Sequence, residues 1–176
     1  MFPTVFAAGL AILLAGPALA QDPQGEGAQA QPREPEVVLA ATHGDWEVRC
    51  IEGTQNCMMV QTVTNGAGEP LIRVEVQKLG GDQQADAVMR FRTPEGVLLQ
   101  SGLGLRVDAG EAVAAPFLTC VRGQCIAQAS LRNQEVAMFK RGAAAELSVV
   151  PANAPNQPVT GTMSLMGFTR SFDSLQ

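Results

Sequence analysis

The stretch that decides the fold is residues 45–64, which read DWEVRCIEGTQNCMMVQTVT. Trp46, Val48 and Cys50 alternate with charged residues, which is the period-two pattern of a strand with one buried face. A polar segment containing a glycine then leads to a second apolar run, which predicts a strand at about Asn56–Thr64. The two runs predict a β-hairpin with a cysteine on each strand beside the turn.

The same alternation continues through the rest of the chain. Turn signals such as Asn65-Gly66 and Asp108-Ala109-Gly110 separate short apolar runs. Further strands are expected around Ile72–Val76 and Met89–Phe91, and at Val97–Gln100, Leu103–Val107, Glu111–Thr119, Cys125–Ser130, Ala145–Val150 and Val159–Leu165. Short strands at this spacing predict a mostly β domain, an antiparallel β-sandwich of Ig-like or barrel-like type.

One or two short helices interrupt the strands. Leu131–Arg141 has apolar residues on one face, with Ser130 as the expected N-cap and Gly142 at the expected C′ position. A second short helix is predicted at Phe168–Leu175.

The N-terminal region has a different composition. Val5–Gly16 is an apolar run of 12 residues, and Ala18-Leu19-Ala20 follows it as a small-x-small cleavage signal. The run is short for a membrane span and suits the core of a signal peptide, with a retained anchor as the alternative. We therefore expect a signal peptide at 1–20, a disordered Pro/Gln/Glu-rich tether at 21–44 and a single β-rich domain at 45–176. This organisation predicts a periplasmic protein with no transmembrane span in its mature form.

The charge of the expected domain argues against one class of partner. Residues 45–176 hold 13 acidic and 11 basic side chains. A nearly neutral domain lacks the basic surface that a phosphate backbone requires, so nucleic acid is not an expected partner.

The four cysteines predict two disulfides. An exported chain with an even number of cysteines points to pairing, and four cysteines allow three arrangements. We favour Cys50–Cys57 and Cys120–Cys125, because each pair closes a short loop between two strands. Zinc binding is a weaker alternative because the first spacing is wide and the only histidine, His43, lies in the expected tether. A redox pair would need C-x-x-C beside a helix.

No pattern in the sequence indicates an enzyme or a cofactor. With a single histidine placed before the domain, a Ser-His-Asp triad is not expected. The one candidate ligand patch consists of four arginines at outward strand positions, Arg73, Arg90, Arg92 and Arg106. They would form an anion-binding patch if their strands were neighbours. The alternative is an ordinary solvated face interleaved with Glu75 and Asp108.

Several motifs occur in the order found in one bacterial family. They are Trp46-Glu47-Val48-Arg49-Cys50 with Cys57, Gly102–Gly110 (GLGLRVDAG), Pro116–Cys120 (PFLTC), Gly123–Ala127 (GQCIA), and Ser164–Phe168 (SLMGF) with Leu175. As an ordered set they resemble the invasion-associated locus B family of exported proteins. The resemblance implies a sandwich-like protein of the periplasm or cell envelope, in a family that is linked to host-cell invasion in some intracellular pathogens. It supplies no catalytic residues.

The sequence therefore favours a non-catalytic interaction module of the periplasm or envelope. Its partner would be an envelope or host protein, contacted through loops such as Gly80–Asp86 or Val121–Gln124. The alternative is a small-ligand binding protein for an anionic metabolite or lipid. A redox or metal protein that uses the cysteines is a third hypothesis.

Overall fold

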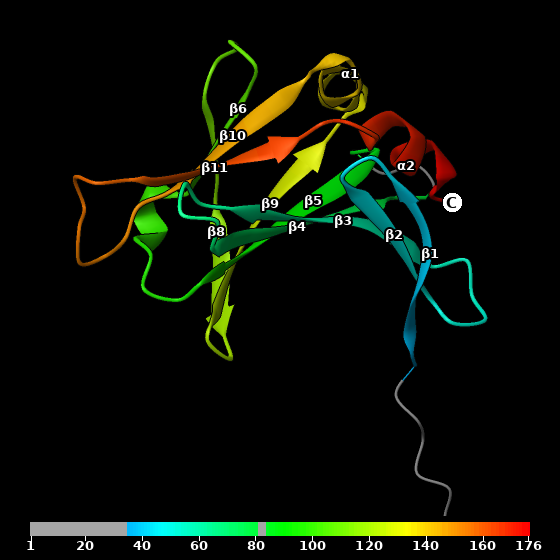
Figure 1. Cartoon of the computed structure of the whole chain (residues 1–176), viewed down its shortest axis with the longest axis horizontal. Coiled ribbons are helices and arrows are strands. Elements are labelled where there is room, and N and C mark those ends of the chain that lie inside the picture. The colour runs from blue at the N-terminus through cyan, green and yellow to red at the C-terminus, as the bar shows by residue number, and fades with distance from the viewer. Residues whose placement is uncertain (1–34, 81–83) are drawn as a thin grey trace, which may run out of the picture. The chain divides into compact units, whose positions relative to one another are not determined.

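The structure is a computed structural model, and it describes residues 35–80 and 84–176. The predicted signal peptide at 1–20 and most of the predicted tether lie outside the described residues. Within the described part, strands form two antiparallel sheets, and two α-helices cover one end of the space between them (Figure 1). The prediction of a mostly β sandwich with short helices is confirmed.

The large sheet has the strand order β1-β2-β3-β4-β5-β9-β8 among the described residues. Its strands are β1 (Val37–His43), β2 (Trp46–Ile51), β3 (Cys57–Thr64), β4 (Pro70–Lys78), β5 (Ala87–Pro94), β8 (Phe117–Val121) and β9 (Gln124–Leu131). Most neighbours are joined by hairpins, so side chains alternate between the core and the outer face. Both ends of this order are edge strands, which makes the sheet open rather than a closed barrel.

The small sheet has the order β11-β10-β6-β7 in the part of the chain that the structure describes. Its strands are β6 (Leu103–Val107), β7 (Val113–Ala115), β10 (Ala144–Val149) and β11 (Val159–Ser164). Strand β11 packs near β3, and an isolated bridge between Asn65 and Gly161 links the two sheets at one corner. The helices are α1 (Asn133–Arg141) and α2 (Phe168–Ser174).

An aromatic cluster of Trp46, Phe139, Phe168 and Phe172 fills the end of the core beneath the helices. Trp46 meets Phe168 edge-on at 5.4 Å between ring centroids, and its Nε1 donates a hydrogen bond to the carbonyl of Ser164 at 2.9 Å. The Trp46 side chain is fully buried. This one residue therefore joins β2, β11 and α2 with both its apolar surface and its polar atom.

The turn between β1 and β2 rests directly on the residues that precede α2. Gly167 has a φ of +88°, and a β-carbon there would collide with the carbonyl of His43. The backbone N–H of Asp45 donates to the carbonyl of Met166 at 3.2 Å. The fold thus explains why a glycine stands in the Ser164–Phe168 motif: the position needs both a left-handed backbone and no side chain.

The expected domain boundary at residue 45 is wrong, because the sheet begins earlier. Strand β1 starts at Val37 and pairs with β2 along its length, from Val37 opposite Ile51 to His43 opposite Trp46. It is an edge strand with a mostly exposed surface, and backbone hydrogen bonds hold it. Its sequence, VVLAATH, is mostly apolar but shows no strict period-two alternation, which is why the strand was not predicted.

Two expected strands are also revised where the chain crosses between sheets. Val97–Gln100 is not a strand: Val97 makes an isolated bridge to Pro151, and Leu99–Ser101 forms a short 3-10 helix. The expected strand Glu111–Thr119 is divided between β7 in the small sheet and β8 in the large sheet. Pro116 stands at the division, where a residue without an N–H cannot continue a ladder.

Helix α1 begins later than predicted. Its N-cap is Arg132, and Ser130 belongs to β9, which pairs with β5 as far as Leu131 opposite Ala87. Gly142 ends the helix in an extended conformation with a φ of −72°, so it is not the left-handed C′ residue that we expected. Among the described residues, the helices are all too short or too polar to cross a membrane.

Candidate functional site

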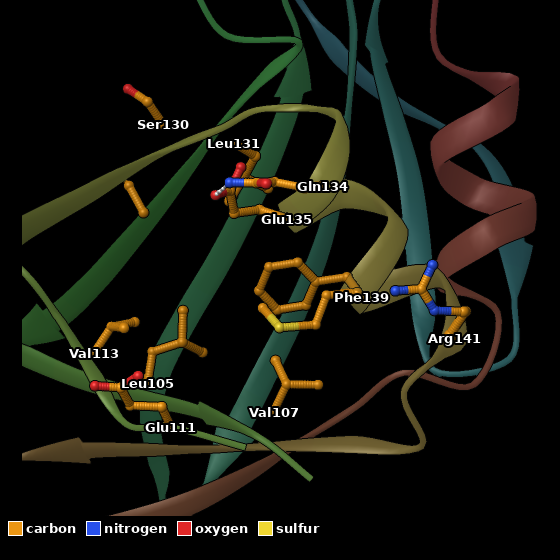
Figure 2. A pocket seen from close by; sticks show the side chains of 12 residues that line it. Leu105, Val107, Glu111, Val113, Ser130, Leu131, Gln134, Glu135, Phe139 and Arg141 are labelled. Carbon is orange, nitrogen blue, oxygen red and sulfur yellow. Dashed lines mark hydrogen bonds between the residues drawn. The ribbon is translucent and has the colours of Figure 1, made fainter. Parts of the chain in front are cut away.

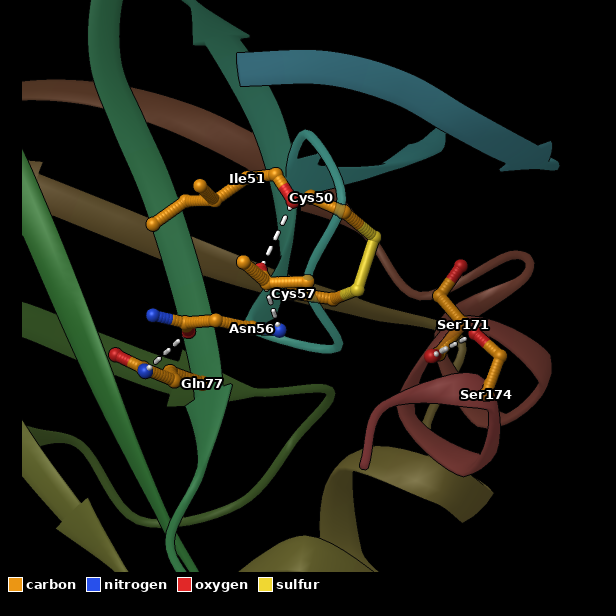
Figure 3. Close-up of a disulfide and its surroundings, with 8 residues drawn as sticks. Cys50, Ile51, Asn56, Cys57, Gln77, Ser171 and Ser174 are labelled. Carbon is orange, nitrogen blue, oxygen red and sulfur yellow. Dashed lines mark hydrogen bonds between the residues drawn. A yellow bond between two sulfur atoms is a disulfide. The ribbon is translucent and has the colours of Figure 1, made fainter. Parts of the chain in front are cut away.

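The predicted disulfides Cys50–Cys57 and Cys120–Cys125 are both present, and they account for all four cysteines. Each joins two residues that lie directly opposite each other in an antiparallel ladder. Cys50 and Cys57 pack against the core, and Figure 3 shows their sulfur–sulfur bond on the side of β2 and β3 that faces α2. All four cysteine sulfurs are therefore bonded in disulfides that join neighbouring strands.

The second disulfide lies in a hairpin that is mostly exposed, although Cys125 itself is buried. Residues 118–124 are all exposed, including the apolar side chains of Leu118 and Val121. The turn is Arg122-Gly123, with φ values of +53° and +76°. Positive φ at both central residues is the geometry of a type I′ turn, which arginine adopts unfavourably. The Cys120–Cys125 bridge lies immediately beside this turn and holds it closed.

Three of the four predicted arginines gather on the outer face of the large sheet. Arg73 on β4 lies opposite Arg92 on β5, and Arg90 on β5 lies opposite Glu75 on β4. Arg106 is separate: it lies on β6 of the small sheet and pairs with the exposed Glu146 at 2.9 Å. The expected four-arginine patch is therefore a three-arginine cluster, because only β4 and β5 are neighbours.

Glu75 is the organising residue of this cluster. Its side chain is 10% exposed, and one of its carboxylate oxygens accepts from the Nε of Arg73 at 2.9 Å and from the Nε of Arg92 at 3.0 Å. Arg90 instead donates from Nε to the side-chain oxygen of Gln128 on β9 at 3.3 Å. The alternative reading, a face interleaved with Glu75, is thus partly right, since one carboxylate faces three guanidinium groups.

A cleft of about 250 Å³ lies beside this cluster, where β4 begins and β5 ends. Arg73, Arg92 and Thr62 line it from the outer face of the sheet, and Gly123 and Gln124 line it from the stapled hairpin. We refer to it as the arginine cleft. The predicted loop Val121–Gln124 therefore forms one of its walls, whereas residues 81–83 of the other predicted loop, Gly80–Asp86, lie outside the described residues.

A larger and mainly apolar cleft of about 560 Å³ opens where the two sheets separate (Figure 2). Strands β6, β7 and β9 and helix α1 surround it, and we call it the α1 cleft. Its apolar lining consists of Leu105, Val107, Val113, Ala129, Leu131, Met138 and Phe139. Val113 and Met138 are 55% and 39% exposed, so part of this apolar lining is in contact with water.

The rim of the α1 cleft carries charges of both signs, from Glu111, Glu135 and Arg141. Glu135 also accepts a hydrogen bond from the backbone N–H of Arg132 at 2.9 Å, at the first turn of α1. A hydrogen bond from the Gln134 side chain, helped by that backbone bond, lowers the pKa of Glu135. This cleft leaves no pattern in the sequence, because its residues come from four segments that each have the pattern of an ordinary strand, turn or helix.

Asp108 has a structural role that its sequence context did not reveal. Its carboxylate accepts from the backbone N–H groups of Ala143 and Ala144, at 3.1 and 3.0 Å. It thereby joins the end of β6 to the start of β10. Across residues 35–80 and 84–176, no three His, Cys, Asp or Glu side chains are grouped so as to hold a metal ion.

Comparison with known proteins matches this architecture. A family model described as invasion associated locus B (IalB) protein covers residues 46–176. Two invasion protein B homologues from Brucella abortus, of strain 2308 and of biovar 1 strain 9-941, are each 30% identical over 141 residues, which is 78% of this chain and 79% of theirs.

A solved structure shows the same fold. The crystal structure of invasion associated protein b from Bartonella henselae superposes with a TM-score of 0.64 at 26% sequence identity, and the match covers 78% of this chain and 96% of that one. The family model begins at Trp46, the residue that joins both sheets to α2, and extends to the last residue. The chain therefore belongs to the invasion associated locus B family.

Proposed function

We propose that this protein is an exported, non-catalytic interaction module that works in the periplasm or cell envelope by binding another protein at the α1 cleft. The observation that carries the proposal is the cleft itself. It is preformed by both sheets and α1, and it leaves the apolar side chains of Val113 and Met138 exposed to water. Apolar surface of this kind, rimmed by polar groups, marks binding sites.

The chemistry of the rim favours a protein as the occupant. Glu111 and Glu135 place carboxylates at the opening, which disfavours a fatty acid or another amphiphile with an anionic head. Arg141 adds a positive charge to the same rim. A protein segment can present an apolar side chain flanked by charges of both signs, and that arrangement complements both the lining and the rim.

Two further observations support export and partner binding. Both disulfides are of the kind that forms in an oxidising compartment. The Brucella relatives are named invasion protein B homologues and the Bartonella relative is named invasion associated protein b, which supports a role in the envelope or toward a host cell.

Site-specific photocrosslinking in intact cells tests the binding surface. A photoreactive residue in place of Met138 should give one discrete adduct with another protein. The same residue in place of Met166, a methionine that is exposed but does not line the α1 cleft, should give none. Ala129→Trp, which fills the cleft from β9, should remove the Met138 adduct while the protein stays folded. Equal adducts at both methionines would contradict the proposal.

The expected compartment has its own test. Protein taken from the periplasmic fraction should have a mass that starts at Gln21 and is four hydrogens below that of the reduced chain. Recovery of the full-length chain in the cytoplasm with free thiols would contradict export.

A further inference from the structure

The arginine cleft contains positive charge that the described residues do not neutralise. Arg73 and Arg92 lie directly opposite each other on β4 and β5. Side chains in such a pair have β-carbons about 4.5–5.5 Å apart, and like charges there repel. Glu75 offsets one of the two charges, and Arg90 adds a third beside them. The two arginines that line the cleft, counted with Glu75, therefore have a net charge of about +1 when Glu75 is ionised. A neighbouring cleft that Arg73 also lines contains Asp45, Glu47 and Arg49.

The hydrogen bonds of Glu75 fix how the two guanidinium groups are presented. Each arginine uses its Nε to bind the carboxylate. Within residues 35–80 and 84–176, the terminal Nη groups of Arg73 and Arg92 make no hydrogen bond to the protein. A guanidinium held at Nε keeps its remaining N–H groups as a fixed fork that matches an oxyanion.

The surroundings of the two arginines are partly polar and partly apolar, because Pro70, Leu71, Ile72 and Pro94 also line the cleft. Thr62 on β3 lies opposite Arg73 in the ladder, so its side chain is on the same outer face. Thr62, Gly123 and Gln124 line the cleft with the two arginines. A volume of about 250 Å³ is sufficient for a phosphate group with a small organic substituent.

We propose that the arginine cleft is a binding site for a phosphate group, held between the Nη groups of Arg73 and Arg92. A phosphate group is negatively charged at pH 7, with about −1.5 to −2 charges for a monoester, and this charge complements the two guanidinium groups. The phosphate belongs either to a free small molecule or to a lipid headgroup. The site is separate from the α1 cleft and does not depend on the function proposed there, because the two clefts share no lining residue.

A titration of the full mature chain with sodium phosphate, followed by NMR of the arginine Nε–H signals at constant ionic strength, tests the site. The signals of Arg73 and Arg92 should shift and saturate. Arg92→Gln should weaken phosphate binding about tenfold or more, because it removes charge-assisted hydrogen bonds. Arg106→Gln is the matched control: it removes the same charge on the small sheet and should change the affinity less than about twofold.

Two additional measurements keep the test decisive. Arg92→Lys retains the positive charge but not the planar pair of N–H groups, so it should still bind phosphate more weakly than the natural chain. This variant also keeps the test valid if Arg92→Gln fails to fold.

Vesicles of phosphatidylglycerol, compared with vesicles of phosphatidylcholine, distinguish a lipid headgroup from a free small molecule as the source of the phosphate. Arg92-dependent binding to phosphatidylglycerol assigns the phosphate to a lipid, and phosphate binding without vesicle binding assigns it to a small molecule. Signals that do not saturate, or an equal loss in Arg106→Gln, would overturn the proposal.

Discussion

The two stapled hairpins carry their disulfides at the same place, beside the turn, yet they lie in opposite surroundings. In the β2–β3 hairpin the strands are flanked by β1 and β4, and the cysteines pack against the core. In the β8–β9 hairpin β8 is an edge strand and residues 118–124 are exposed, so only the β9 end of the bridge, Cys125, is buried. One hairpin is therefore part of the packed scaffold, while the other presents a rigid turn beside the arginine cleft. The Cys50–Cys57 disulfide therefore stabilises the packed part of the fold, whereas the Cys120–Cys125 disulfide fixes the shape of an exposed turn.

The largest expected effect follows from removing the central side chain of the covered region. Trp46→Ala should lower the free energy of unfolding by about 3–5 kcal/mol, because it leaves a cavity beside Phe168 and removes one of the two hydrogen bonds that the Ser164 carbonyl accepts. Leu118→Ala in the exposed hairpin should change the same quantity by about 0.5 kcal/mol or less, since Leu118 is 59% exposed. Urea denaturation of both variants measures the difference, and equal losses would contradict the contrast between the hairpins.

Removal of each disulfide sharpens the same comparison. On the chain-entropy model both bridges close short loops, so replacing Cys50 and Cys57 with alanine should cost about 2 kcal/mol. Replacing Cys120 and Cys125 should cost less, because an edge hairpin that opens locally without its bridge regains part of the lost chain entropy in the folded state. The distribution of the loss should differ. Without Cys50–Cys57, amide exchange should accelerate throughout the core, because the most protected amides of the core open through global unfolding. Without Cys120–Cys125, exchange should accelerate mainly in residues 118–125, where the edge strand can open locally.

Hydrogen exchange of the two alanine variants at matched pH checks this prediction. Accelerated exchange in the core of the Cys120/Cys125 variant, equal to that in the Cys50/Cys57 variant, would show that the exposed hairpin belongs to the cooperative scaffold. The natural chain under non-reducing conditions is the reference.

The contrast also explains what could be predicted from sequence. Strict alternation at Trp46–Cys50 and the paired cysteines were sufficient to predict the sandwich and both bridges, because buried strand faces leave a periodic pattern. Strand β1 was missed because its side chains are mostly exposed and its apolar residues do not alternate with polar ones. The division of the expected strand Glu111–Thr119 at Pro116 was missed because the sheet to which each half belongs depends on tertiary contacts that the local sequence does not show.

The candidate sites show the same limit. The sequence placed Arg73, Arg90 and Arg92 on outward positions, and this placement is correct, but only strand order reveals that Arg106 lies on the other sheet. The α1 cleft depends on four separate segments meeting, and no local pattern carries that information. Arginine positions can thus be inferred from periodicity, whereas a shared cavity requires the topology.

The smallest expected effect concerns α1, which follows β9 at the covered end. Glu135 accepts hydrogen bonds from the Gln134 side chain and the Arg132 backbone, and its pKa is lowered from 4.5. Because the folded-state pKa lies below the unfolded value, the ionised carboxylate adds stability above pH 4.5, and this contribution is lost as the pH falls through the folded-state pKa. Glu135→Gln keeps an oxygen that can accept from the Arg132 N–H, but this side chain cannot ionise.

The urea midpoint of the natural chain should therefore fall slightly more than that of the Glu135→Gln variant between pH 7 and pH 3. At the lower pH the urea midpoints of the two chains should become similar. The difference should be small because the side chain is exposed and solvent screens its charge. Equal losses in both chains would mean that the ionised carboxylate adds nothing to the stability of α1, and that the covered end is held by its aromatic packing alone.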